Sequence, residues 1–94
     1  MSRMQAKDSA ANYLRVSPFS RNGLIAQLQF DGFSSQDATF AVDSQNADWL
    51  VVAARRAALY MITPSFSRSG LIGQLVFDGF TQSQAEHGAN SVGL

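Results

Sequence analysis

The chain has 94 residues, of which 46% are apolar and 15% charged, and its 7 basic residues balance its 7 acidic ones. This length suits one small domain, or two units of about 47 residues that share a core. The zero net charge gives no basic field for nucleic acid or for an anionic membrane surface. The absence of cysteine excludes disulfides, thiolate metal sites, thiol catalysis and a cysteine-linked lipid on the chain as given.

Residues 2–16 predict an amphipathic helix. Apolar and small residues recur at helical spacing, and polar residues fill the other positions. Pro18 ends the helix, because proline disfavours a helical conformation in the residue before it. The predicted inward side comprises Met4, Ala6, Ala10, Ala11, Tyr13 and Leu14.

Residues 21–30 predict a second helix, with Ser20 as its N-cap. The side-chain oxygen of Ser20 is placed to accept hydrogen bonds from the free backbone N–H groups of the first turn. Phe19, just before the cap, pairs with Leu24 as a hydrophobic staple. We expect Leu24, Ile25 and Leu28 to face the core.

A glycine predicts the end of this helix. Gly32 takes the left-handed conformation that closes a helix, and Phe33 folds back onto Leu28 in a Schellman turn. A β-branched residue at Gly32 should be costly, because a positive φ is expensive for any side chain with a Cβ. Asp31, beside the glycine, is expected to bond local backbone N–H groups.

Residues 35–43 predict a third helix, with Ser34 as its cap. Its inward side is formed by small or branched residues, with Phe40 as an aromatic at the edge. Two short helices joined by a glycine turn have helix-turn-helix geometry. The predicted inward residues are Ala38, Ala41 and Val42.

A fourth helix is predicted over residues 47–62, with Asn46 as its cap and Asp48 in its first turn. It follows the first helix by 47 positions, and the alanines and the tyrosine of the first helix recur in it. We expect its Trp49 and Tyr60 face to pack in the second unit.

The differences between the first and fourth helices predict a second neighbour for the fourth. Gln5 corresponds to Val52 and Asn12 to Leu59, so a polar face has become apolar. A helix that is apolar on two faces has two neighbours. We therefore predict that Val52 and Leu59 close over the first unit, which makes this a shared central helix.

A fifteen-residue segment, here called the repeated word, occurs twice in the chain. With residue n set against residue n+47, twelve of the fifteen positions from Phe19 to Phe33 agree with those from Phe66 to Phe80. The second copy therefore predicts helices at 68–77 and 82–89. In it, Thr81 and Gln84 fit a capping box, and Gly88 and Gly93 weaken the end of the last helix. The structural motif comprises Phe19, Ser20, Gly23, Leu24, Leu28, Gly32, Phe33, Trp49, Phe66, Ser67, Gly70, Leu71, Leu75, Gly79 and Phe80.

These elements predict an all-α fold. It consists of two tandem helix-turn-helix-like three-helix units, residues 1–46 and 47–94, that share a long central helix. We expect the chain to be a monomer.

The residues predict no catalytic, cofactor or metal site. His87 is the only histidine, so no second histidine or cysteine can complete a metal site with it. Ser20 and Ser67 have no paired base in either copy, and this favours helix caps over nucleophiles.

Four repeated polar residues are the candidate partner contacts: Arg21, Gln27, Arg68 and Gln74. Solvated arginines are the ordinary interpretation of the first and third. The two glutamines lie in the middle of apolar helices. They could bond across to the central helix or contact a partner.

A helix-turn-helix fold also suggests nucleic-acid binding, with the third and sixth helices in the major groove. Phosphate contacts need lysine or arginine, whereas the third helix carries Asp37 and Asp43, and the sixth carries Glu86 beside His87. A nucleic-acid-binding adaptor is therefore the alternative function, and salt-dependent retention on DNA would favour it.

Several stretches resemble the repeat of the Ltp family of host cell surface-exposed lipoproteins. They are Ser-Pro-Phe-Ser-Arg-Asn-Gly-Leu-Ile-Ala-Gln-Leu at 17–28, Phe-Asp-Gly-Phe-Ser at 30–34, Asp-Ala-Thr-Phe-Ala-Val-Asp at 37–43 and Ala-Asp-Trp at 47–49. The ending at 81–94 is similar to the usual finish of the family. The resemblance covers nearly the whole chain.

The resemblance implies a protein-binding module of a surface lipoprotein. Phage- or prophage-encoded members are lipid-anchored on the outer face of the Gram-positive cytoplasmic membrane. They act in superinfection exclusion by blocking entry of phage DNA, with the phage tape-measure protein as a partner. The resemblance implies no enzyme, cofactor or small-molecule substrate.

The chain departs from the family in having no lipobox cysteine and no apolar signal-peptide core at its N-terminus. Its longest apolar run, residues 49–54, is too short to cross a bilayer. We therefore expect either an excised soluble region or a protein that works elsewhere.

Overall fold

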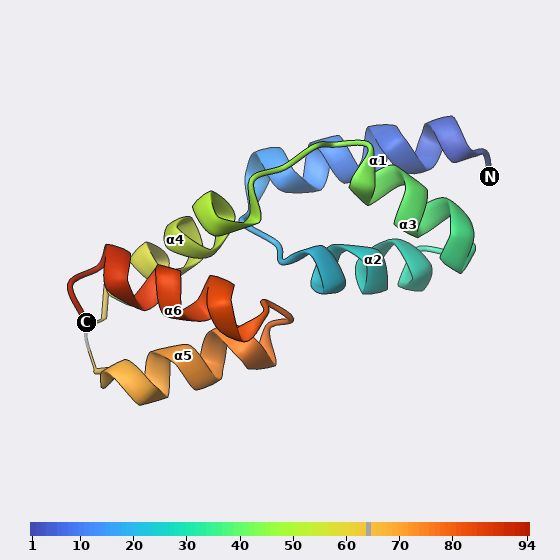
Figure 1. The fold of residues 1–94 in the computed structure, drawn as a ribbon. Helices are drawn as coiled ribbons and strands as arrows, with labels where there is room; N and C mark the ends of the chain where they lie inside the picture. Colours follow the sequence, from blue (N-terminus) through green and yellow to red (C-terminus); the bar gives the residue numbers. More distant parts are fainter. Residues whose placement is uncertain (64) are drawn as a thin grey trace. The chain divides into compact units, whose positions relative to one another are not determined.

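The computed structural model describes residues 1–63 and 65–94, which contain six α-helices and no strand (Figure 1). The all-α prediction is confirmed, and α2, α3 and α5 have the predicted bounds. The helices are α1 (Arg3–Val16), α2 (Arg21–Phe30), α3 (Ser35–Asp43), α4 (Trp49–Tyr60), α5 (Arg68–Phe77) and α6 (Gln82–Ser91).

The chain forms two compact units, Met1–Ala47 and Asp48–Leu94. In the first unit α3 packs against both α1 and α2, and in the second α6 packs against both α4 and α5 (Figure 1). The last helix of each unit therefore holds the other two together. Each unit is one copy of the repeat.

The core of each unit is built from the same repeat positions. Among residues 1–63 and 65–94, sixteen apolar side chains are buried, and almost all of them come from positions that are buried in both copies. They include Ala6, Ala10, Leu24, Leu28, Phe33, Ala38 and Val42 in the first unit, and Ala53, Ala57, Leu71, Leu75, Phe80, Ala85 and Ala89 in the second. Small residues on α1 and α4 thus pack against leucines and phenylalanines of the helix-turn-helix.

Two residues of α1 do not face inward as predicted. Ala6 and Ala10 are fully buried, but Met4 and Ala11 are exposed. An α-helix turns by about 100° per residue, so Met4 lies about 200° around the helix from Ala6. The buried stripe of α1 is therefore narrower than the sequence analysis predicted.

The cap of α4 also differs from the prediction. Asn46 has a φ of +51°, a left-handed conformation that an N-cap residue does not adopt. Asp48 is the N-cap instead, and its carboxylate accepts from the backbone N–H of Leu50 at 3.1 Å. The helix therefore begins at Trp49 and is shorter at both ends than predicted.

Gly88 lies inside α6 and does not weaken its end, because α6 continues to Ser91. A Cβ built on Gly88 would lie 3.1 Å from the backbone oxygen of Ala53 in α4 and 3.0 Å from Cδ1 of Leu75. The glycine therefore permits a close approach of α6 to α4. The first unit has Ala41 at this position.

The contacts assign α4 to the second unit, where it packs on α5 and α6. The predicted sharing of this helix concerns the packing of one unit on the other, and it stays a prediction. Of the two side chains expected to close over the first unit, Val52 is 6% exposed and Leu59 is 48% exposed.

Candidate functional site

The repeated word begins with a serine cap in both copies. The Oγ of Ser20 accepts from the backbone N–H of Gly23 at 2.9 Å, and the Oγ of Ser67 accepts from Gly70 at 3.0 Å. Both serines therefore satisfy one of the free N–H groups at the helix start. Ser20 is buried whereas Ser67 is exposed.

The word ends with the predicted Schellman turn. Gly32 and Gly79 have φ angles of +105° and +104°. The backbone N–H of Phe33 donates to the oxygen of Leu28 at 3.0 Å, and the N–H of Gly32 donates to the oxygen of Gln29 at 3.0 Å. This pattern satisfies two free carbonyls at the helix end and buries the phenylalanine after the glycine.

The carboxylate before each turn glycine accepts hydrogen bonds from side chains, and those of Asp31 come from side chains and not from local backbone N–H groups as predicted. In the first unit the Tyr13 hydroxyl donates to Oδ2 of Asp31 at 2.6 Å, and the Gln27 amide donates to Oδ1 at 3.0 Å. The backbone N–H groups of the turn already bond helix carbonyls. The carboxylate therefore fastens the end of α2 to α1.

The second unit repeats this network. The Tyr60 hydroxyl donates to Oδ2 of Asp78 at 2.5 Å, and the Gln74 amide donates to Oδ1 at 3.0 Å. Gln74 also donates to the Tyr60 hydroxyl at 3.3 Å. This glutamine therefore bonds across to α4, which is one of the two roles predicted for it. A tyrosine eighteen residues before the aspartate in both copies was the signal that the sequence analysis missed.

The network raises the pKa of both tyrosine hydroxyls. The hydrogen bond to Asp31, followed by desolvation, raises the pKa of Tyr13, because a tyrosinate would repel the carboxylate and lose that bond. Burial is the larger cause of the raised pKa of Tyr60, followed by its hydrogen bond to Asp78. Each hydroxyl is therefore a structural donor.

Each tyrosine ring also contacts the phenylalanine that opens the word. The rings of Tyr13 and Phe19 meet edge to face with centroids 5.3 Å apart, and those of Tyr60 and Phe66 with centroids 5.4 Å apart. These distances lie in the favourable range for aromatic pairs. The first phenylalanine of the word thus binds the helix-turn-helix to the preceding long helix.

The two arginines predicted as partner contacts bond within their own units. Arg21 makes a two-pronged ion pair with Asp43 at 2.7 and 3.0 Å. Its guanidinium lowers the pKa of the Asp43 carboxyl, because hydrogen bonds to a carboxylate favour the ionised form. In the second unit Arg68 donates to the neutral amide oxygen of Asn90 at 2.7 Å.

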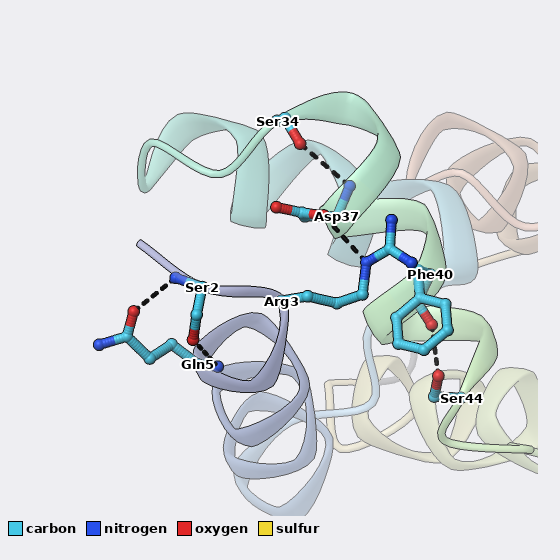
Figure 2. Close-up of polar contacts among 7 residues, drawn as sticks. All are labelled: Ser2, Arg3, Gln5, Ser34, Asp37, Phe40 and Ser44. Atoms are coloured by element: carbon cyan, nitrogen blue, oxygen red, sulfur yellow. Dashed lines mark hydrogen bonds and ion pairs between the residues drawn. The ribbon is translucent and has the colours of Figure 1, made fainter.

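The first unit contains a second ion pair (Figure 2). The guanidinium of Arg3 donates to Oδ1 of Asp37 at 3.0 Å and lies 4.3 Å from the ring centroid of Phe40. It thereby joins the start of α1 to α3. Figure 2 also shows the reciprocal capping box of Ser2 and Gln5 at the first turn of α1.

Phe30 and Phe77 are large apolar side chains of the repeated word that are exposed to solvent. They occupy the same repeat position, the last residue of α2 and of α5. Phe30 is 87% exposed and Phe77 is 85% exposed. The other residues on this outer side differ between the copies, with Gln29 corresponding to Val76. A large aromatic ring that is exposed in both copies is a candidate contact for a partner.

The described residues show no metal-binding group. Between residues 1 and 63 and between 65 and 94, no cluster of three or more histidine, aspartate or glutamate side chains has the proximity that a metal ion needs. His87 is exposed on α6.

A family model described as host cell surface-exposed lipoprotein matches residues 2–44 and 48–92. One match therefore falls on each three-helix unit, and together they span nearly the whole chain. The chain belongs to this family of surface lipoproteins, which is not a family of enzymes. No curated protein and no solved structure shows a significant match. Within residues 1–63 and 65–94, no helix has the length and apolar character needed to span a bilayer.

Proposed function

We propose that this chain is a protein-binding module of a lipoprotein on the outer face of a Gram-positive cytoplasmic membrane. It acts in superinfection exclusion, blocking entry of phage DNA by engaging the phage tape-measure protein, and it performs no catalysis. The family match supports the lipoprotein role. The paired exposure of Phe30 and Phe77 is the observation that supports a protein contact.

The proposed contact lies on the phenylalanines because the four polar candidates have partners inside their units. Arg21 bonds Asp43 and Arg68 bonds Asn90, while Gln27 and Gln74 bond the aspartates before the turn glycines. A partner would have to break these bonds to use those side chains. An exposed phenylalanine has no internal hydrogen bond to break before it contacts a partner, and burial of its ring in the contact is favourable.

Two equal contacts on one chain favour a partner that binds both. One phenylalanine gives only a small buried area, and alone it makes a weak site. When one unit is bound, the other is held near the partner at high effective concentration. Truncating either ring should weaken binding by about tenfold, which is roughly 1.4 kcal/mol, and truncating both should weaken it much further.

The test expresses the chain behind a secretion signal and a lipid anchor in a phage-sensitive host. The wild-type chain should reduce phage DNA entry while adsorption is unchanged. The double variant Phe30→Ala, Phe77→Ala should restore entry, whereas Gln29→Val, which copies the second unit at an exposed position, should not. Surface immunoblotting checks that all variants are displayed equally.

Two results would contradict the proposal at different levels. Unchanged DNA entry with the anchored wild-type chain removes the exclusion role for the phages tested. Full exclusion by the double variant keeps that role but removes the phenylalanines from the contact. Direct binding of the purified chain to the tape-measure protein of an excluded phage separates the two cases.

A further inference from the structure

The outer face of α4 is mostly apolar, and it is exposed. Its side chains follow one another at helical spacing on the side away from Ala53 and Ala57, which are buried. Ile62, just past the helix end, is 76% exposed. The residues of this outer face are Val51, Arg55, Ala58, Leu59 and Ile62, and all five are exposed.

The corresponding face of α1 has a different chemistry at the same geometry. It consists of Met4, Asp8, Ala11, Asn12 and Arg15, and all five are exposed. The helices α1 and α4 therefore have the same position in their units, but the side chains on their exposed faces differ. Asp8 corresponds to Arg55, Asn12 to Leu59 and Arg15 to Ile62. Only Ala11 and Ala58 are identical.

The charge on the α4 face complements an anionic surface. Between Trp49 and Tyr60 the helix carries two arginines and no acidic residue, and Arg55 lies in the middle of the exposed face. The zero net charge of the whole chain hides this local difference. An arginine among aliphatic side chains can keep its guanidinium among the headgroups while its methylene stem and its neighbours lie against the apolar part of the bilayer.

Membership of a lipoprotein family indicates a bilayer as the anionic surface. A lipoprotein is held at a membrane by its lipid, so a domain on the same chain is tethered to a bilayer. Tethering raises the effective concentration of the surface, and a face too weak to bind from solution can then bind. One arginine near an anionic bilayer adds only a small favourable free energy, which suits a tethered contact.

We propose that the outer face of α4, formed by Val51, Arg55, Ala58, Leu59 and Ile62, rests on an anionic phospholipid surface. The polar face of α1 does not. This contact goes beyond the proposed capture of a phage protein and uses other residues. It would orient the second unit at the membrane while the phenylalanines remain available.

The chain has no cysteine, so one can be introduced as the site of a fluorescent label. Ala58→Cys places the environment-sensitive dye NBD in the α4 face, and Ala11→Cys places it at the same repeat position in α1. A histidine tag before Met1 tethers the full chain to vesicles that carry a nickel-chelating lipid in phosphatidylcholine with phosphatidylglycerol. We expect a blue shift and a rise in emission at position 58, and neither at position 11.

Variants that copy α1 into α4 give the matched control. Arg55→Asp and Leu59→Asn, both at exposed positions, should remove the emission change at position 58 without altering the circular dichroism spectrum. Vesicles of phosphatidylcholine alone should also reduce it, because the arginine then has no anionic headgroup nearby.

Three results would overturn the proposal. The first is an unchanged emission at position 58 on tethered vesicles. The second is an equal change at positions 11 and 58, which would mean that tethering alone brings any face to the lipid. The third is a blue shift without vesicles. A shift that grows with protein concentration would mean that a second copy of the chain covers the face, and a shift that is independent of concentration would mean that the first unit covers it. Because none of these tests uses the phenylalanines, their outcome is independent of phage exclusion.

Discussion

The two units have the same helices and the same core positions, but their surface bonds differ. The first unit joins its helices with the ion pairs Arg3–Asp37 and Arg21–Asp43. The second has a neutral Arg68–Asn90 bond in place of the latter. It also has the close approach at Gly88, where the first unit has Ala41.

This difference separates what the fold needs from what it tolerates. The leucines, the turn glycines and the Tyr–Asp–Gln network are the same in both copies, so they define the unit. Exposed ion pairs contribute little, because water screens the charges and ordering the side chains costs entropy. A duplicated sequence can therefore change its surface bonds and keep its architecture.

The largest effect should come from the shared core. Leu28 and Leu75 are both fully buried, and replacing either by alanine should cost about 3–5 kcal/mol. That is comparable with the whole stability of a unit of this size, at roughly 0.05–0.15 kcal/mol per residue. Amide hydrogen exchange of each unit, followed by NMR, measures the loss.

This pair of variants also tests the predicted sharing of α4. Trp49 lies in the second unit and is the only tryptophan. We expect Leu75→Ala to shift its fluorescence transition in urea. If α4 serves the second unit alone, Leu28→Ala should leave that transition in place. Equal shifts would instead support a helix that both units share.

A smaller effect should come from the turn glycines, where the copies are again alike. Gly32→Val and Gly79→Val force a β-branched residue into a positive φ, at a cost of roughly 2 kcal/mol. Thermal unfolding followed by circular dichroism should show both variants less stable. A wild-type midpoint for either would mean that its turn relaxes to another conformation.

The Gly88 position should separate the units. Gly88→Ala adds a methyl group against the Ala53 backbone and should destabilise the second unit by about 1–2 kcal/mol. The alanine that the first unit carries at this position, Ala41, is fully buried without such a cost. We expect faster amide hydrogen exchange that is confined to residues 48–94. Protection equal to that of the wild type would show that α6 can move away from α4.

The smallest effect should come from exchanging the surface bonds. Asp43→Asn gives the first unit the neutral bond of the second and should cost less than about 1 kcal/mol. Asn90→Asp should add an ion pair to Arg68 and stabilise the second unit by a similar amount. Urea titrations of both variants measure the exchange, and a loss in the second case would contradict it.

The same ion pair gives the first unit a dependence on pH. Arg21 lowers the pKa of Asp43 below its ordinary value of 3.8. The folded unit therefore holds fewer protons on this group than the unfolded chain does, and the stabilisation is fully present above that value. It is lost as pH falls through the lowered pKa. Acid unfolding followed by NMR should show a contribution in the first unit that Asp43→Asn removes.

The sequence by itself determined the units and their turns. Helix caps and turn glycines act through neighbouring backbone atoms, so Ser20, Gly32 and Gly79 could be placed from local patterns. The offset of 47 residues carried each of these to the second copy. The same local reasoning failed at Asn46, because Asn46 and Asp48 are both polar residues that could cap α4.

Only the tertiary structure decided which side chains meet across helices and which stay in water. The bond from Tyr13 to Asp31 joins residues eighteen positions apart, and no local pattern specifies it. The exposure of Phe30 follows from where α3 packs on α2, since hydrophobicity alone would place a phenylalanine inside. Burial depends on the distances between helices, which local sequence preferences do not fix.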